Sequence, residues 1–242
     1  MPTTSARTAA GSARVRSRRA GGVLAAAALT TLVLSVSACG SNNPAVVLGD
    51  TSPAPSAQPS PVAAIDPLTG VSTTVVLDPA FLQGLTTLTL TPAATGKATL
   101  VGDRATFPIT GGDLTYFDPS SGVRPFVQGA VDHEGSGLQL TGPNGKVVRL
   151  TDFVVDPGTS TLTGSVEVDG TVAAPSAPLF FLDGRTLKPL ANGAMPGTAV
   201  LAGTTVSLTK AAADLLNTTF GTTALTEFSP VGVAEITVST GS

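Results

Sequence analysis

Short segments in which hydrophobic and polar residues alternate run through the chain from about residue 66 to residue 238. Neighbouring side chains of an extended strand point to opposite faces, so each segment predicts a strand with one face buried in an antiparallel sheet. The alternating segments are 86–91, 104–110, 137–142, 161–170, 204–209 and 233–239.

Turn-forming residues separate these segments. The Pro-Asn-Gly stretch at 143–145 predicts a hairpin, because Asn-Gly accepts the positive φ that such turns need. Residues 156–158 and 169–170 predict two further turns. About 170 residues are enough to bury one sizeable core. We therefore predict a single β-rich domain over 67–242, mainly β, folded as an antiparallel β-sandwich or open barrel.

Helical signals are few. Thr209 is a good N-cap for an apolar pattern of helical spacing, and Gly221 is a good C-terminal stop. This predicts one short C-terminal helix. A shorter helical turn is predicted at 78–85, where Asp78 can cap the first turn and a proline follows it.

The first 38 residues have a different composition. They carry five arginines and no acidic residue, and an apolar run at 23–36 follows. This pattern predicts a signal peptide at 1–38 that is removed on export. A membrane-spanning helix is not predicted, because the apolar run is too short. The stretch 17–19 resembles a twin-arginine export signal, although glycines follow where that motif has apolar bulk. An ordinary basic start is the alternative.

Cys39 is the only cysteine, and it has no partner for a disulfide. The stretch 36–39, Val-Ser-Ala-Cys, resembles the lipobox of bacterial lipoproteins. The resemblance implies that Cys39 is lipidated and that the membrane is a partner through this lipid anchor. It places the protein on the outer face of the plasma membrane, with its β-domain extracytoplasmic. A plain secretion signal with an incidental cysteine is the alternative.

A linker rich in Pro, Ser and Ala is predicted at 39–66, since this composition cannot bury a core. Such a stalk resembles those of actinobacterial lipoproteins, some of which are glycosylated; an unmodified spacer is the alternative. Without the signal, the chain has eight basic and sixteen acidic residues, a formal charge of −8. A negatively charged chain of this kind is not expected to bind nucleic acid or anionic lipid through electrostatic attraction.

The densest polar cluster lies at 131–137. In a strand, Asp132 and Glu134 share one face and His133 points to the other. The two carboxylates are candidate ligands for a divalent cation such as calcium, but calcium takes six to eight oxygens, which would require Asp113 or Asp118 as well. A solvated strand end is the alternative interpretation.

Catalytic patterns are scarce. The chain has one histidine and no Gly-x-Ser-x-Gly elbow, and zinc would have to be held with that histidine alone once Cys39 is lipidated. We therefore predict that the protein is not an enzyme.

A second resemblance covers about two thirds of the mature chain. Segments 107–119, 129–142, 148–166 and 206–221 resemble secreted bacterial β-domains, among them the HtaA-type domains of actinobacterial haem-uptake proteins. The resemblance implies a β-sandwich and a haem ligand. In those domains a Tyr near the domain start, with a neighbouring Trp, is central to haem binding, and residues 75–91 here contain neither.

Tyr116 and His133, the only residues of their types, remain as candidate ligand-binding residues, because both types can ligate haem iron. The alternative for Tyr116 is a buried ring with a solvated hydroxyl. The sequence thus predicts a surface-anchored lipoprotein with a binding or scaffolding β-domain, its partner in the cell wall or envelope. A haem- or lipid-carrying lipoprotein is the second hypothesis, and an envelope hydrolase is the third.

Overall fold

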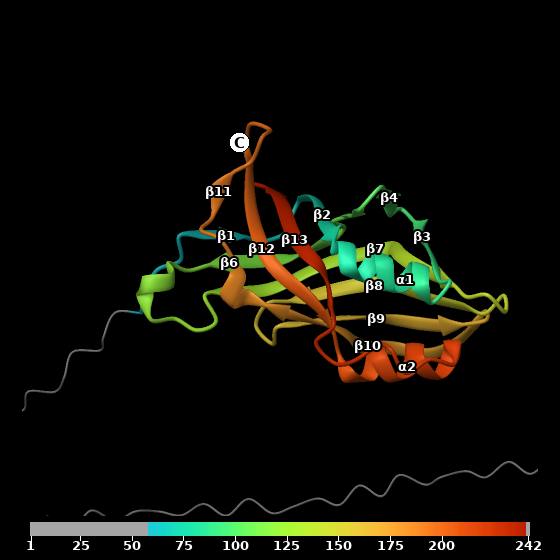
Figure 1. The fold of residues 1–242 in the computed structure, drawn as a ribbon. Coiled ribbons are helices and arrows are strands. Elements are labelled where there is room, and N and C mark those ends of the chain that lie inside the picture. Colours follow the sequence, from blue (N-terminus) through green and yellow to red (C-terminus); the bar gives the residue numbers. More distant parts are fainter. Residues whose placement is uncertain (1–57, 241–242) are drawn as a thin grey trace, which may run out of the picture. The chain divides into compact units, whose positions relative to one another are not determined.

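The computed structural model describes residues 58–240, which form one curled antiparallel sheet with two α-helices (Figure 1). The strands follow the order β1-β6-β7-β8-β9-β10-β12-β13-β2-β5-β4, with β11 paired to β12 and β3 paired to β7. The curl resembles an opened barrel, so the predicted mainly β class with a sandwich or open-barrel layout is confirmed.

The strands are β1 Ala63–Ile65, β2 Gly70–Leu77, β3 Thr91–Gly96, β4 Thr99–Val101, β5 Arg104–Pro108, β6 Gly111–Tyr116, β7 Val127–Thr141, β8 Val147–Asp156, β9 Thr161–Val168, β10 Thr171–Asp183, β11 Ala191–Asn192, β12 Thr198–Leu208 and β13 Pro230–Ser239. The helices are α1 Pro79–Thr87 and α2 Lys210–Phe220, with short 3₁₀ turns η1 Pro119–Ser121 and η2 Gly184–Thr186. Neither α-helix of this described part is long and apolar enough to cross a membrane.

Local side-chain chemistry sets the helix ends. The Asp78 carboxylate accepts the Ala80 backbone N–H at 2.7 Å and begins α1. The Thr209 hydroxyl accepts the Ala212 N–H at 3.1 Å and begins α2, and Gly221 ends it with a φ of 68°. Both predicted helical segments are therefore confirmed.

The strand predicted over 86–91 is wrong. Helix α1 continues to Thr87, and the N–H of Leu90 then donates to the carbonyl of Leu85 at 2.8 Å to close the helix end. Within 86–91, Leu90 is buried and Leu88 is half-buried. The alternation therefore arises because the end of the helix turns both leucines toward the protein, and the next strand, β3, begins only at Thr91.

The three predicted turns lie between consecutive strands from β7 to β10. Asp169 and Gly170 have φ values of 50° and 81°, the two positive values of a type I′ hairpin turn. Asp156 accepts the Thr159 N–H at 3.1 Å within the β8–β9 turn. These turns bring β7, β8, β9 and β10 side by side without long connections.

The longest strand, β7, joins three neighbours. Its first half pairs with β6, its second half pairs with β3, and β8 follows its other edge. The register against β8 shifts between His133 and Gly137, and Gly135 has a φ of 71°. Such a bulge re-aims side chains. The strand continues through 131–137, where His133 and Ser136 are buried while Glu134 and Gly135 stay exposed, so the interpretation as a solvated strand end holds only for the exposed residues.

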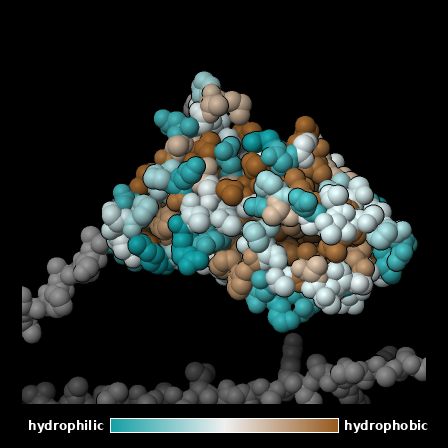
Figure 2. All heavy atoms as spheres, in the orientation of Figure 1, coloured by the Kyte–Doolittle hydropathy of each residue, from teal (hydrophilic) through white to brown (hydrophobic). Residues whose placement is uncertain are grey.

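The core fills the inside of the curl. Phe107, Phe153 and Phe180 form a chain of edge-to-face contacts, with ring centroids 5.4 and 6.4 Å apart. Figure 2 shows hydrophobic surface between α1 and α2, where the helices flank the sheet. The first strand, β1, uses residues from the end of the predicted linker and pairs with β6. The predicted boundaries of signal, linker and domain are otherwise not tested.

Candidate ligand-binding groove

A groove of about 420 Å³ lies where the β6–β7 loop, the end of β10 and strands β12 and β13 meet. Its size falls within the range of small-molecule sites in proteins, roughly 300–1,000 Å³. Its walls are mainly apolar and include Phe126, Phe181, Leu187, Leu201, Ala234 and Ile236.

The β6–β7 loop forms one wall and is held by its own hydrogen bonds. The N–H of Phe117 donates to the carbonyl of Phe126 at 2.7 Å, which closes the loop. At its start the Asp118 carboxylate accepts from the hydroxyl and N–H of Ser120, and these hydrogen bonds lower the pKa of Asp118. Phe126 also packs edge-to-face on Tyr116, at 6.0 Å between ring centroids. The wall is therefore preformed.

The opposite wall ends at η2. The Arg185 guanidinium donates to both carboxylate oxygens of Asp183, at 2.9 and 2.8 Å. The Arg185 side-chain hydrogen bond lowers the pKa of Asp183, and the same hydrogen bond raises the pKa of Arg185. These two parallel hydrogen bonds hold the guanidinium group of Arg185 in one orientation at the groove.

Arg124 is the second arginine of the groove. Its Nη1 donates to the carbonyl of Val123 at 2.7 Å. Four ion pairs form among residues 58–240, and Arg124 belongs to none of them. The lining thus contains two cationic side chains and one anionic side chain, Asp183.

An exposed aromatic residue stands beside the groove. Phe228 is 58% exposed and packs edge-to-face on Phe181, at 5.5 Å between centroids. Its φ is 62°, a conformation that is an outlier for a bulky residue. Its N–H donates to the carbonyl of Leu208 at 2.9 Å, which holds it there.

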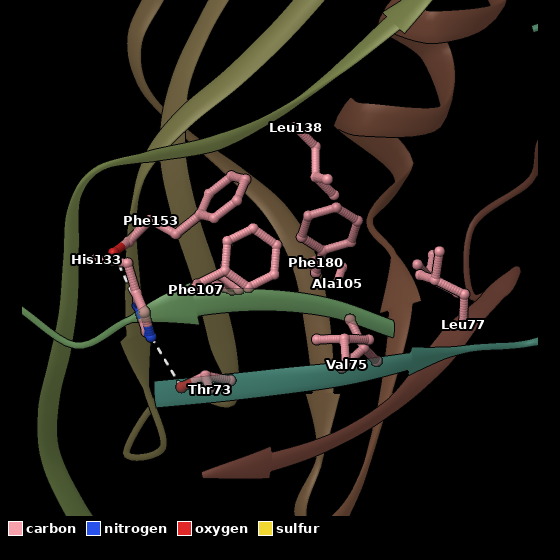
Figure 3. Close-up of a pocket in the computed structure, with 12 residues that line it drawn as sticks. Thr73, Val75, Leu77, Ala105, Phe107, His133, Leu138, Phe153 and Phe180 are labelled. Atoms are coloured by element: carbon pink, nitrogen blue, oxygen red, sulfur yellow. Dashed lines mark hydrogen bonds between the residues drawn. The ribbon is translucent and has the colours of Figure 1, made fainter. Parts of the chain in front are cut away.

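His133 lies elsewhere, in the core. It lines a separate cavity of only about 40 Å³ together with Phe107, Phe153 and Phe180 (Figure 3). Its Nδ1 is 3.3 Å from the carbonyl of Phe153, and its Nε2 is 2.8 Å from the hydroxyl of Thr73. Burial lowers the pKa of His133 to about 4, against a smaller opposing effect of the Phe153 carbonyl.

Tyr116 is buried on β6, behind the groove wall at Phe126. It pairs with Val127, six residues along β7 from His133, a separation of about 20 Å in an extended strand. The two candidate ligand-binding residues therefore do not share one site. A role for either in binding stays a prediction.

Asp132 is half-buried and Glu134 is exposed on β7. No group of three or more His, Cys, Asp or Glu side chains in the stretch 58–240 is arranged to hold a metal ion. Two carboxylates fall well short of the six to eight oxygens that calcium takes, so the described residues do not complete the predicted metal site. Cys39 lies outside the described residues.

Sequence reasoning did not identify the groove residues. The one local signal is the run Leu179–Leu182, Leu-Phe-Phe-Leu, in which apolar residues occupy both faces of a strand instead of one. Such a run indicates contacts on both faces of the strand end. Arg124 and Phe228 carry no comparable signal.

Comparison with known proteins supports the fold. No protein-family model matches the chain, and no curated protein sequence matches it significantly. The structure is similar to the crystal structure of the C-terminal domain of HtaA from Corynebacterium glutamicum, with 14% identity and a TM-score of 0.51, over 72% of this chain and 99% of that one. A domain-swapped dimer of a variant of that domain matches with 13% identity and a TM-score of 0.42, over 67% and 91% of the two chains. At this identity the likeness concerns the fold alone.

Proposed function

We propose that this protein is a lipid-anchored, non-catalytic binding protein of the bacterial cell envelope, whose β-domain binds an apolar ligand in the groove. The observation that carries the proposal is the groove of about 420 Å³ with mainly apolar walls. Preformed apolar pockets with a few polar groups are the usual form of small-molecule sites.

The anchoring part rests on the lipobox-like stretch that ends at Cys39. The described chain enters the domain beside the groove, because the N–H of Val62 donates to the carbonyl of Tyr116 at 2.8 Å and Tyr116 packs on Phe126. A ligand that leaves the membrane would therefore meet the groove close to the point at which the tether joins the domain.

The non-catalytic part is supported by His133. A general base must reach the proton that it removes. The only histidine of the chain is 2% exposed, and both of its ring nitrogens face protein oxygens. An envelope hydrolase with this histidine as its base is consequently the least favoured function.

Haem transport is the second candidate. It is supported by the resemblance to HtaA-type domains and by the position of Tyr116 directly behind the groove wall at Phe126. Haem added to the purified protein should then produce a shifted Soret band, and the shift should be lost in Tyr116→Phe. An unshifted band would exclude this candidate.

The groove can be tested with the mature chain carrying Cys39→Ser, which prevents acylation. We expect saturable binding of the neutral fluorescent probe N-phenyl-1-naphthylamine. Ile236→Trp and Thr204→Trp place an indole among the groove residues and should weaken binding about tenfold or more, since a filled pocket loses its apolar contacts.

The matched control is Val233→Trp on the same strand as Ile236, because Val233 is 46% exposed and does not line the groove. It should bind the probe like the unsubstituted protein. Absence of saturable binding, or equal binding by all variants with native circular dichroism spectra, would overturn the proposed groove.

A further inference from the structure

The charges of the groove differ in sign from those of the whole protein. The mature chain is acidic, with eight basic and sixteen acidic residues. The groove reverses this balance, because Arg124 and Arg185 line it with only one carboxylate, that of Asp183. An apolar groove with a local surplus of one positive charge is complementary to a ligand that has an apolar body and a single negative charge.

The arginines are arranged to bind such a charge. Arg185 uses Nε and Nη2 for Asp183, so its Nη1 remains for another acceptor. Arg124 makes no ion pair in the described part of the chain and uses Nη1 for a backbone carbonyl. Charge-assisted hydrogen bonds from guanidinium groups to oxyanions are among the stronger ones in proteins.

The apolar part of the groove fits a chain. Its lining includes aliphatic residues of β12 and β13 together with Phe126, Phe181 and Leu182. Phe228 packs on Phe181 and remains 58% exposed. Exposed aromatic residues in strained conformations are uncommon in a surface loop and point to a contact with something outside the chain.

We infer that the groove binds a single-chain fatty-acid carboxylate, with the carboxylate at Arg124 and Arg185 and the acyl chain along the apolar walls towards Phe228. This inference rests on the proposed function, because it names the ligand of the same groove. A carboxylate is preferred over a phosphate monoester, since the latter carries about 1.5 to 2 negative charges and the groove offers a surplus of one positive charge.

Competition for the bound naphthylamine probe tests the head group. The competitors share a twelve-carbon chain and differ only at the head: dodecanoate, dodecyl phosphate, dodecan-1-ol and dodecyltrimethylammonium. We expect dodecanoate to displace the probe at a concentration about tenfold below that of dodecan-1-ol, because a hydrogen bond to a charged group is stronger than one to a neutral group. The cationic competitor should be the weakest.

Substitutions test the assigned residues. Arg124→Gln should remove most of the advantage of dodecanoate over dodecan-1-ol. Arg104→Gln is the matched control, since Arg104 is exposed, belongs to no ion pair in the described chain and does not line the groove. Asp183→Asn should act in the opposite direction and strengthen dodecanoate binding severalfold, because it removes the only carboxylate of the groove. If Arg124 and Asp183 had only a structural role, the two substitutions would not change dodecanoate binding in opposite directions.

The outcomes separate this inference from the proposed function. If the probe binds in the groove but dodecanoate and dodecan-1-ol compete equally, the groove is still a binding site, and the assignment of a carboxylate head group is wrong. Tighter binding of dodecyl phosphate than of dodecanoate would also overturn the fatty-acid assignment. If the probe does not bind at all, the proposed function itself fails.

Discussion

Thr73 on β2 and His133 on β7 form a hydrogen bond of 2.8 Å inside the core, although they are sixty residues apart in the chain. On its other side, His133 faces the carbonyl of Phe153, which can only accept. Nδ1 of the neutral ring therefore carries the hydrogen, and Nε2 accepts from the Thr73 hydroxyl. The histidine thus connects β2 to the paired strands β7 and β8 across the inside of the curl, where β2 makes no ladder with either of them.

The first prediction concerns pH. Burial lowers the pKa of His133 from 6.5 to about 4, so the unfolded chain binds a proton between these values and the folded chain does not. The free energy of unfolding should therefore be unaffected by His133 above pH 6.5 and should fall by about 3 kcal/mol as the pH decreases to about 4. Urea unfolding at pH 7.5, 6, 5 and 4.5 measures this loss.

His133→Gln is the control, because glutamine does not titrate and its stability should be nearly flat over this window. The carboxyls of Asp118, Asp169 and Asp183 have pKa values lowered below 3.8, so their contributions are lost only at lower pH. If the free energy of unfolding changes equally with pH in both proteins between pH 6.5 and 4, His133 is not the group that titrates.

The second prediction removes the partner of the histidine. Thr73→Val keeps the shape of the side chain but leaves Nε2 of His133 buried without a donor, which should cost about 1–3 kcal/mol. Thr74→Val on the same strand is the matched control, because the Thr74 hydroxyl pairs with that of Thr106 in a half-buried position. It should cost less than about 1 kcal/mol. Equilibrium unfolding at pH 7.5 compares the two.

The third prediction concerns a buried hydroxyl. Ser136 is 1% exposed, and its Oγ has no hydrogen-bond partner in the structure. Ser136→Ala should therefore leave the protein as stable as before or stabilise it by about 1 kcal/mol, since an unpaired buried hydroxyl is unfavourable. Gly137→Ala next to it should destabilise, because a Cβ there would collide with the carbonyl oxygen of Leu150. A rise in melting temperature for the first variant and a fall for the second are the expected results.

The fourth prediction separates strain from contact at Phe228. Alanine removes the ring and keeps a residue that is strained at a φ of 62°, whereas asparagine removes the ring and tolerates this conformation. Phe228→Asn should be more stable than Phe228→Ala by about 1 kcal/mol. Both should bind dodecanoate severalfold more weakly than the unsubstituted protein. Unchanged affinity would remove Phe228 from the proposed binding surface.

The fifth prediction concerns the anchor. Cys39→Ala should leave the precursor uncut or release the protein into the medium, since no sulfur remains to carry the lipid. The β-domain should still fold, because the described core contains no cysteine. Cell fractionation and the intact mass locate the protein and show whether acyl chains are attached. A membrane-bound Cys39→Ala protein of acylated mass would contradict lipidation at this residue.

Local patterns identified much of the fold. The turn at Asp169 and Gly170, the caps at Asp78 and Thr209, and the stop at Gly221 are readable because each depends on a few neighbouring residues. The same reasoning failed at 86–91, where the end of α1 imitates the alternation of a strand. Periodicity over six residues cannot distinguish these cases, because the end of a helix can also turn Leu88 and Leu90 toward the protein.

The burial of His133 was open to misreading for a different reason. Its neighbours Asp132, Glu134 and Gly135 are polar or turn-forming, which is typical of a solvated loop. In the structure, β7 continues through them, and His133 lies on the same strand face as the fully buried Val131. Which face of a strand is buried depends on the elements that pack against it, and these lie outside the local segment.

The sequence by itself determined parts of five strands (β5, β7, β9, β12 and β13), the turns from β7 to β10, the helix caps, the lipobox-like start and the overall negative charge, because these depend on neighbouring residues or on composition. Only the tertiary structure decided that Arg124 and Arg185 line one groove, that Phe228 packs on Phe181, and that Thr73 meets His133. The physical reason is that these contacts join residues from 47 to 61 positions apart, and the register and curl of the whole sheet set the distances between them.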